Sequence, residues 1–211
     1  MAEQIELDTL RENAIQKARA PELHELSENI VFGEGNPDAQ LMIVGEGPGE
    51  AEDNSGRPFV GRAGQLLDKI LESVSINRDD VYITNIVKYR PPGNRNPSQK
   101  EIEASDWLIL EQIKLIGPQI IATLGNVPTQ YFLQSKEGIT KTHGEWYEWQ
   151  SGIKLMPLYH PAYLLRNPSR TQGAPKWQMW EDMKKLKAEM DSLGVKTNKV
   201  NIDTAQQDGL F

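Results

Sequence analysis

The chain has 211 residues, a net charge of −7 and no cysteine, and 38% of its residues are hydrophobic. This length suits one domain with short appendages. The lack of cysteine excludes disulfides, thiolate zinc sites and an iron–sulfur cluster held by the chain's own thiolates. Without a run of about 18 apolar residues or an apolar N-terminal signal segment, we expect a cytoplasmic protein that does not enter a membrane.

The first half of the chain predicts alternating helices and strands. A loose apolar pattern indicates a helix over 5–19, and a short apolar run ending at Gly45 indicates a buried strand over 41–44. Five glycines and two prolines over 45–61 indicate a long loop, of a kind that is usually functional. An amphipathic helix over 63–74 and a strand over 81–87 follow.

The second half continues this alternation. Ser98 and Glu101 form a capping-box pattern, which predicts a helix that runs to about residue 116. The apolar patterns then predict a buried strand over 119–124, a short helix over 127–133, a hairpin with arms over 146–149 and 153–158, and a helix over 175–193. Such alternation is typical of a parallel α/β sheet covered on both faces.

Charge is distributed unevenly along the chain. Residues 1–38 hold nine acidic and three basic residues, whereas the windows 84–100 and 151–180 hold basic residues and no acidic ones. A local basic face allows an acidic protein to bind a polyanion. On charge alone, however, an ordinary solvated surface explains these windows better.

Polar residues follow three of the predicted strands, where sites gather in open α/β sheets. Glu46 and Glu52 lie in the glycine loop, Asn85 follows the second strand, and His160 follows the last one. Taken singly, each has an ordinary explanation: Glu46 and Glu52 as residues of a solvated turn, Asn85 as a turn cap after its strand, and His160 as a packing histidine. The glycine loop also lacks the lysine of a Walker A loop and the spacing of a dinucleotide-binding loop.

Taken together, three segments resemble family 4 of the uracil-DNA glycosylase superfamily. They are Gly-Glu-Gly-Pro-Gly-Glu-Ala-Glu-Asp over 45–53, Ser-Gly-Arg-Pro-Phe-Val-Gly over 55–61, and His-Pro-Ala-Tyr-Leu-Leu-Arg-Asn-Pro-Ser-Arg over 160–170. The resemblance extends from about residue 31 to residue 180. It implies a three-layer α/β/α fold with a central four-stranded parallel sheet, and hydrolysis of the N-glycosidic bond of deoxyuridine in DNA, which leaves an abasic site.

The resemblance also implies roles in the pocket. Phe59 would stack on a flipped uracil, Asn85 would pair with its O4 and N3–H, and His160 would donate to O2 as negative charge grows there. Glu46 is the first choice for the carboxylate that orients water, and Glu52 is the second. In the best-known branch of the superfamily an aspartate occupies the position matched here by Gly47, so neither glutamate stands at that position. We expect Gly47 and Asp53 to contact the substrate as well.

Further positions match DNA contacts of the family. Leu164 falls where relatives carry the wedge that enters the vacated base stack. The basic residues expected to hold phosphates are Lys88, Arg90, Arg95, Arg166 and Arg170.

One departure concerns a cofactor. Members of this family usually hold a four-iron cluster through four cysteines, but Tyr89 and Ala104 stand at two of these positions, and the other pair falls near Lys17 and Ala20. We therefore expect no iron–sulfur cluster and no other cofactor. Because the pocket motifs are intact, we expect packing to replace the cluster.

The last residues predict a partner. Gln207, Leu210 and Phe211 resemble the short motif that binds the bacterial sliding clamp, and the polar stretch before them would serve as a tether. The alternative is that the apolar end packs on the body of the protein. We expect a single glycosylase domain over 1–194, including a helical segment over 1–30, with a flexible tail over 195–211, acting as a monomer at the nucleoid.

Two other functions stay open at this point. A catalytically inactive scaffold of the same fold could bind DNA or a clamp, although the intact pocket residues disfavour it. An enzyme acting on free pyrimidine nucleotides is disfavoured by the two acid-free windows and the wedge loop.

Overall fold

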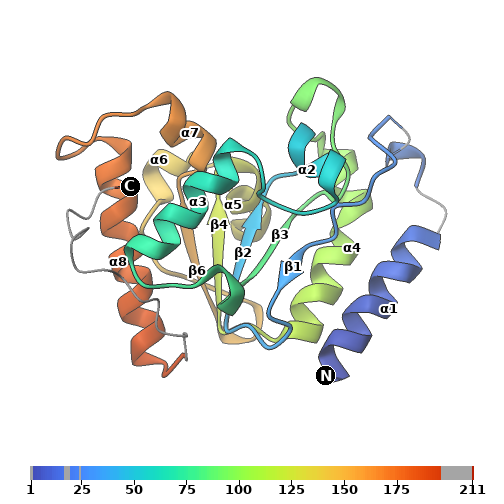
Figure 1. Cartoon of the computed structure of the whole chain (residues 1–211), viewed down its shortest axis with the longest axis horizontal. Helices are drawn as coiled ribbons and strands as arrows, with labels where there is room; N and C mark the ends of the chain where they lie inside the picture. Colours follow the sequence, from blue (N-terminus) through green and yellow to red (C-terminus); the bar gives the residue numbers. More distant parts are fainter. Residues whose placement is uncertain (1, 17–19, 24, 196–210) are drawn as a thin grey trace.

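A six-stranded sheet forms the centre of the computed structural model, which describes residues 2–16, 20–23, 25–195 and 211 (Figure 1). The strand order is β1-β3-β2-β4-β6-β5. The strands are β1 (Glu34–Gly35), β2 (Leu41–Gly45), β3 (Tyr82–Asn85), β4 (Ile120–Leu124), β5 (Tyr147–Trp149) and β6 (Ile153–Leu158). The central four are parallel, while β1 and β5 pair antiparallel at the two edges. The predicted fold class is confirmed, and two short edge strands extend the expected four-stranded sheet.

Helices cover both faces of this sheet. The α-helices are α1 (Ala2–Gln16), α2 (Glu50–Ser55), α3 (Arg62–Ser73), α4 (Gln99–Ile116), α5 (Asn126–Leu133), α6 (Ile139–Thr142), α7 (Pro161–Arg166) and α8 (Pro175–Ser192). Short 3₁₀ turns lie at Pro21–Leu23, Arg78–Asp80, Pro92–Asn94 and Gln150–Gly152. The capping box predicted at Ser98 and Glu101 is confirmed at the start of α4.

Two apolar cores separate the three layers. One face of the sheet packs against apolar residues of α3, α7 and α8, and the other against those of α1, α4 and α5. The strands β2 and β4 are buried along their whole length, as expected for mainly apolar strands when helices cover both faces. Figure 1 shows the N-terminal α1 and the C-terminal α8 at opposite sides of the sheet.

Several elements differ from the sequence-based expectations. The strand expected over 81–87 is regular only over Tyr82–Asn85, although Ile86 and Val87 still donate to the carbonyls of Gly45 and Glu46. The glycine loop contains the short helix α2. Helices α6 and α7 are too short for a periodic pattern to reveal them. The 146–158 hairpin is confirmed, with Tyr147 opposite Leu155.

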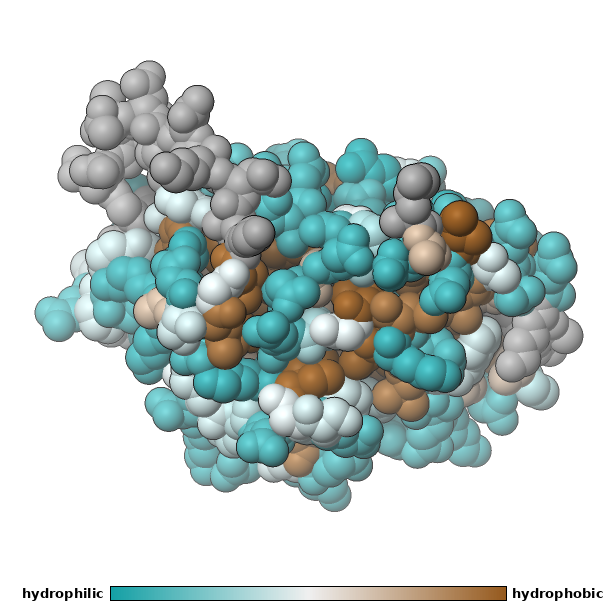
Figure 2. All heavy atoms as spheres, turned by 90° about the horizontal axis from the view of Figure 1, so that it is seen from below, coloured by the Kyte–Doolittle hydropathy of each residue, from teal (hydrophilic) through white to brown (hydrophobic). Residues whose placement is uncertain are grey.

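The lower face of the molecule lies at the amino ends of the parallel strands. Figure 2 shows apolar residues in the middle of this face, surrounded by hydrophilic ones. Within the described part of the chain, no helix has the length and apolar character needed to cross a membrane.

A third, smaller apolar cluster lies beneath the N-terminal segment. Its buried members are Leu23, Leu26, Val87 and Tyr89, with Ala20, Ile30 and Ala104 packed against them. Backbone hydrogen bonds from Ser27 to Arg90 and from Val31 to Lys88 attach this segment to the loop after β3. The segment before β1 is therefore part of the folded body.

Candidate active site

The carboxyl ends of the four parallel strands meet at one cavity of about 650 Å³. Glu46 follows β2, Asn85 ends β3, Gly125 follows β4 and His160 follows β6, and all four line this cavity. The predicted pocket residues Gly47, Glu52 and Phe59 line it too. The tertiary structure thus brings together most of the pocket residues that the sequence motifs predicted. The volume exceeds that of a nucleobase and leaves room for an attached sugar.

Asn85 presents an unusual amide to this cavity. Its side chain is buried, and its Oδ1 has no hydrogen-bond partner among the described residues. A buried amide oxygen ordinarily has a partner, so an unpartnered one in a cavity wall marks a place for a ligand donor. A Cβ on Gly45 would lie 2.4 Å from this oxygen and 2.6 Å from Cζ of Phe59. Only glycine at position 45 lets these two side chains approach each other.

Phe59 is held in a strained backbone conformation. Its φ is +52°, in the left-handed region that aromatic residues rarely adopt. Arg78 donates to the carbonyl of Pro58 at 2.7 Å, and the carboxylate of Glu52 accepts from the N–H groups of Val60 and Gly61. These bonds hold the loop on both sides of Phe59, which orients its ring toward the cavity.

Glu52 lines the cavity, but its carboxylate is engaged by the backbone of its own loop. Its Oε1 accepts from the Val60 and Gly61 N–H groups at 2.9 and 2.8 Å, and its Oε2 accepts from the Gly49 N–H at 3.2 Å. A carboxylate engaged by three backbone donors is a brace for the loop. These three bonds limit the freedom of Glu52, the second choice for orienting water, and favour the first choice, Glu46.

Glu46 lines the cavity; its backbone carbonyl accepts from the Val87 N–H at 3.1 Å, while its carboxylate has no hydrogen-bond partner among the described residues. Burial raises the pKa of its carboxyl above the ordinary value. A partly desolvated carboxylate with a raised pKa is a better proton acceptor than an exposed one.

His160 is the N-cap of α7, and its ring is fixed by the backbone. Its Nδ1 accepts from the Ala162 N–H at 3.1 Å, which leaves the ring proton on Nε2. Burial, with a smaller contribution from the nearby Arg166 cation, lowers the pKa of His160 to about 4. The ring lies 5.8 Å from that of Phe59. The cavity thus contains a neutral imidazole whose Nε2–H is a fixed donor.

Three expected site residues lie elsewhere. Lys88 is fully buried, and its ammonium is bound to three protein oxygens, so it cannot reach a phosphate. Leu164 is fully buried against α3 because the apolar side of α7 packs there; the exposed leucine of this helix is Leu165. Asp53 faces a second, smaller cavity, between α2 and the N-terminal segment, where its side chain cannot touch a substrate in the first.

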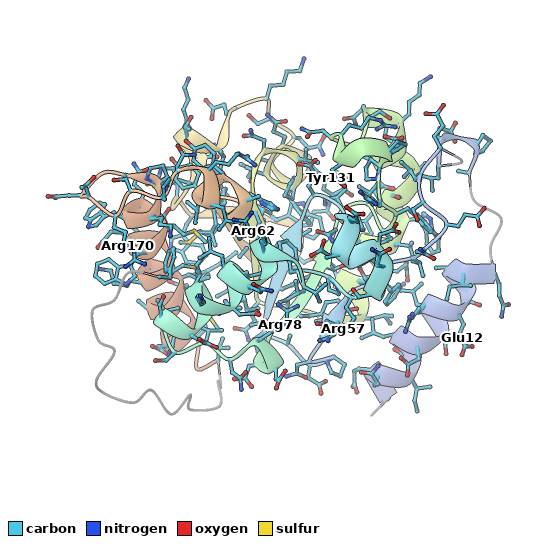
Figure 3. The ribbon with its side chains drawn as sticks, turned by 45° about the horizontal axis from the view of Figure 1, so that its top comes forward. Glu12, Arg57, Arg62, Arg78, Tyr131 and Arg170 are labelled. Atoms are coloured by element: carbon cyan, nitrogen blue, oxygen red, sulfur yellow. The ribbon has the colours of Figure 1, made fainter. Side chains whose placement is uncertain are left out.

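Four expected arginines stand at or near the surface. Arg166 lines the cavity rim, and Arg170 is exposed in the loop between α7 and α8, where Figure 3 labels it. Arg95 also lines the cavity, but its guanidinium pairs with Glu101 at 2.7 and 2.8 Å. Arg90 is partly buried beside Glu50 and Asp53.

Sequence reasoning missed the residues that brace the site. Arg78 bridges Glu34 and Asp68 as well as the Pro58 carbonyl, and Arg57 also pairs with Glu34; Figure 3 labels both arginines. No local pattern could reveal this network, because it joins residues 44 positions apart. Gln112, a buried polar residue of α4, was a signal for a separate network, the one around Lys88.

The described residues do not fit an iron–sulfur cluster. Tyr89, Ala104 and Ala20, which stand at or near the cysteine positions of the resembling family, belong to the small apolar cluster that contains Leu23 and Leu26. Lys17, the remaining position, lies outside the described residues. The chain has no cysteine to supply a thiolate, and side chains fill this space.

Comparison with known proteins agrees with this architecture. The family model described as the uracil DNA glycosylase superfamily matches residues 32–184. The Type-4 uracil-DNA glycosylase of Thermotoga maritima is 47% identical over 165 residues, which cover 78% of this chain and 86% of that protein. The corresponding Type-4 enzyme of Sulfurisphaera tokodaii is 42% identical over 190 residues, covering 86% of this chain and 83% of its own. A Type-5 uracil-DNA glycosylase of Pyrobaculum aerophilum is 32% identical over 153 residues, which cover 64% of this chain and 67% of that protein. The chain belongs to the uracil DNA glycosylase superfamily.

Proposed function

We propose that this protein removes uracil from DNA by hydrolysing the bond between N1 of the base and C1′ of its deoxyribose. The observation that carries the proposal is the unpartnered Oδ1 of Asn85 in a cavity that also contains a fixed Nε2–H donor on His160. Uracil offers N3–H to the Asn85 oxygen and O4 to its amide N–H. Cytosine has a donor amine at C4 and an acceptor at N3, so it is mismatched at both positions.

Bond cleavage moves the bonding electron pair onto the base. Negative charge then spreads from N1 to O2, and the sugar becomes cation-like at C1′. In our proposal His160 donates its Nε2–H to O2, as an oxyanion-hole donor does. The neutral ring suits this role, because at neutral pH it donates a hydrogen bond without transferring a proton.

Water completes the reaction at C1′. Glu46 orients the water and accepts its proton while the hydroxyl bonds to C1′; the proton is then released to solvent, and the uracil anion is protonated in turn. The negative charge of Glu46 also stabilises the cation-like sugar. Phe59 stacks on the flipped base, and the Gly47 backbone borders the same space.

The DNA strand would lie across the cavity mouth. Arg166 and Arg170 are the exposed cations best placed for phosphates, with Arg95 and Arg90 nearer to acidic partners. The exposed Leu165 replaces the buried Leu164 as our candidate for the wedge in the vacated stack.

We further propose that the enzyme works without an iron–sulfur cluster. The packed cluster around Tyr89 takes over the mechanical role of joining the N-terminal segment to the loop after β3. The catalytic steps above need no redox or metal chemistry.

The tail proposal concerns delivery to DNA. Gln207 and Leu210 lie outside the described residues, while Phe211 packs against the core near the first turn of α8, where its backbone oxygen accepts from Lys176 at 3.2 Å. A single glycosylase domain over 1–194 would act as a monomer at the nucleoid, and release of Phe211 would free the 195–211 tail for a sliding clamp.

The decisive experiment is incubation with oligonucleotides containing one uracil, thymine or cytosine. Alkaline cleavage of abasic sites measures the product. We expect cleavage of the uracil strand alone, and loss of at least about tenfold in rate for Asn85→Ala. Binding of DNA without abasic-site formation would support the inactive scaffold instead.

A further inference from the structure

Lys88 has the most unusual environment of any charged group that the structure describes. It is fully buried, and its ammonium donates to three neutral oxygens: Thr84 Oγ1 at 2.6 Å, the Asn85 carbonyl at 2.7 Å and Gln112 Oε1 at 2.6 Å. These three acceptors use the three N–H donors of an ammonium group. Burying an ammonium group costs desolvation free energy, so the groups that it bonds indicate its structural role.

The Asn85 carbonyl needs this donor because the sheet ends beside it. Ile86 donates to the Gly45 carbonyl on β2, so the carbonyl of Asn85, one residue earlier, faces the opposite side of β3. On that side β1 pairs only with Tyr82 and Ile83. Lys88 thus supplies the hydrogen bond that a longer edge strand would have supplied.

The ammonium itself is anchored from two directions. Gln112 of α4 accepts from Lys88 and donates through Nε2 to the Phe32 carbonyl at 2.8 Å and to the Tyr82 hydroxyl at 3.2 Å. Thr84 donates to the same Phe32 carbonyl at 2.9 Å while it accepts from Lys88. The position of the Asn85 backbone is therefore tied to α4 and to the segment before β1.

We infer that Lys88 is a positioning residue for uracil recognition, which fixes the end of β3 so that the Asn85 amide faces the base edge. The inference rests on the proposed role of Asn85. Little freedom is available there, because Asn85 Oδ1 and the Phe59 ring already converge on Gly45. A small tilt of the Asn85 backbone misaligns two hydrogen bonds to uracil at once.

The first test compares Lys88→Met with Lys176→Met in single-turnover assays on uracil DNA. Lys176 is also largely buried and bonds a backbone oxygen, that of Phe211, so it is a matched control for the loss of a buried ammonium. We expect Lys88→Met to slow the reaction by about 10²-fold and to weaken inhibition by free uracil, and Lys176→Met to stay within about twofold. The inference would be overturned if folded Lys88→Met kept both the wild-type rate and the inhibition by uracil. It would also be overturned if the loss of rate were fully explained by the fraction of the variant that is unfolded.

A chemical rescue covers the case in which Lys88→Met does not fold. Because the chain has no cysteine, Lys88→Cys carries a unique thiol that can be alkylated in the unfolded protein. Aminoethylation restores an ammonium at nearly the reach of lysine, whereas carbamidomethylation does not. We expect activity after refolding only from the aminoethylated protein, and equal activity of both products would contradict the inference.

An Asn85→Ala arm separates the two proposals. If Asn85→Ala keeps full activity, the proposed recognition of uracil by Asn85 fails. If Asn85→Ala loses activity while Lys88→Met keeps it, only the positioning role of Lys88 fails.

Discussion

At the scale of single residues, the site depends on protonation states that the surrounding backbone imposes. His160 accepts a hydrogen bond on Nδ1, and burial keeps its ring neutral above about pH 4. Glu46 shows the opposite effect of burial, because desolvation raises the pKa of an acid and lowers that of a base. These shifts suit the proposed roles of His160 as a neutral donor and of Glu46 as a proton acceptor.

Replacing His160 tests the neutral donor. We expect His160→Ala to lower the single-turnover rate by about 10²–10³-fold, the usual effect of losing an oxyanion-hole donor. His160→Gln retains an N–H donor and should recover part of this loss. Equal rates for Ala and Gln variants would exclude hydrogen-bond donation as the role of His160.

Replacing Glu46 tests the proton acceptor through the pH profile. The wild-type rate should fall as the pH drops through the pKa of Glu46, which lies above the ordinary glutamate value of about 4.3. Glu46→Gln should lower the rate by about 10²–10⁴-fold and remove this acidic fall. The remaining activity should then decline only near pH 4, where His160 becomes protonated. A mutant profile that keeps the wild-type acidic limb would assign that limb to another group.

At the scale of elements, the glycine loop and α3 form one unit around Phe59. A Cβ on Gly64, in the first turn of α3, would lie 1.8 Å from the Phe59 carbonyl oxygen. The helix therefore approaches the strained residue so closely that no side chain fits between them.

Gly64→Ala is the corresponding prediction. This change in a helix normally stabilises a protein by about 0.5–1 kcal/mol. Here we expect a loss of about 1–3 kcal/mol in the free energy of unfolding, together with lower activity, because Phe59 must move. Urea denaturation and single-turnover assays measure both, and Gln65→Ala, at an exposed position of the same helix, is the control. Normal activity in Gly64→Ala would show that Phe59 can shift without harm.

At the scale of the whole molecule, an apolar cluster around Tyr89 occupies the region where the resemblance implied a metal cluster. The purified protein should show no absorption band near about 400 nm, where thiolate-bound clusters absorb. Activity should also survive incubation with a strong chelator. Stoichiometric iron with activity that disappears on chelation would contradict this prediction.

The C-terminal tail is tested with a purified sliding clamp. The 195–211 peptide should bind it with a Kd of about micromolar order, as expected for a short segment that orders on contact. A peptide with Leu210→Ala and Phe211→Ala should not bind. In the full chain, Lys176→Met should strengthen clamp binding, because it removes the bond to Phe211. If both peptides bind equally, or neither binds, the tail has no such role.

Local sequence determined much of this protein. Short, mainly apolar runs predicted the buried strands β2 and β4, the Ser98 capping box predicted the start of α4, and the three motifs predicted Glu46, Phe59 and His160 in the cavity wall. These features depend on neighbours within a few residues, or on the rule that parallel strands end at one edge, so a single sequence carries them.

Only the tertiary structure decided the rest. Lys88 stands in a basic window of the sequence, which favours a surface position. In the structure it is buried, and its ammonium donates to Gln112, which lies 24 residues later in the chain. Of two adjacent leucines in α7, packing against α3 buries Leu164 and exposes Leu165. Glu52 became a brace because the loop folds back to bring the Val60 and Gly61 N–H groups to it. Burial and hydrogen-bond partners depend on contacts between distant segments, which local pattern and composition do not specify.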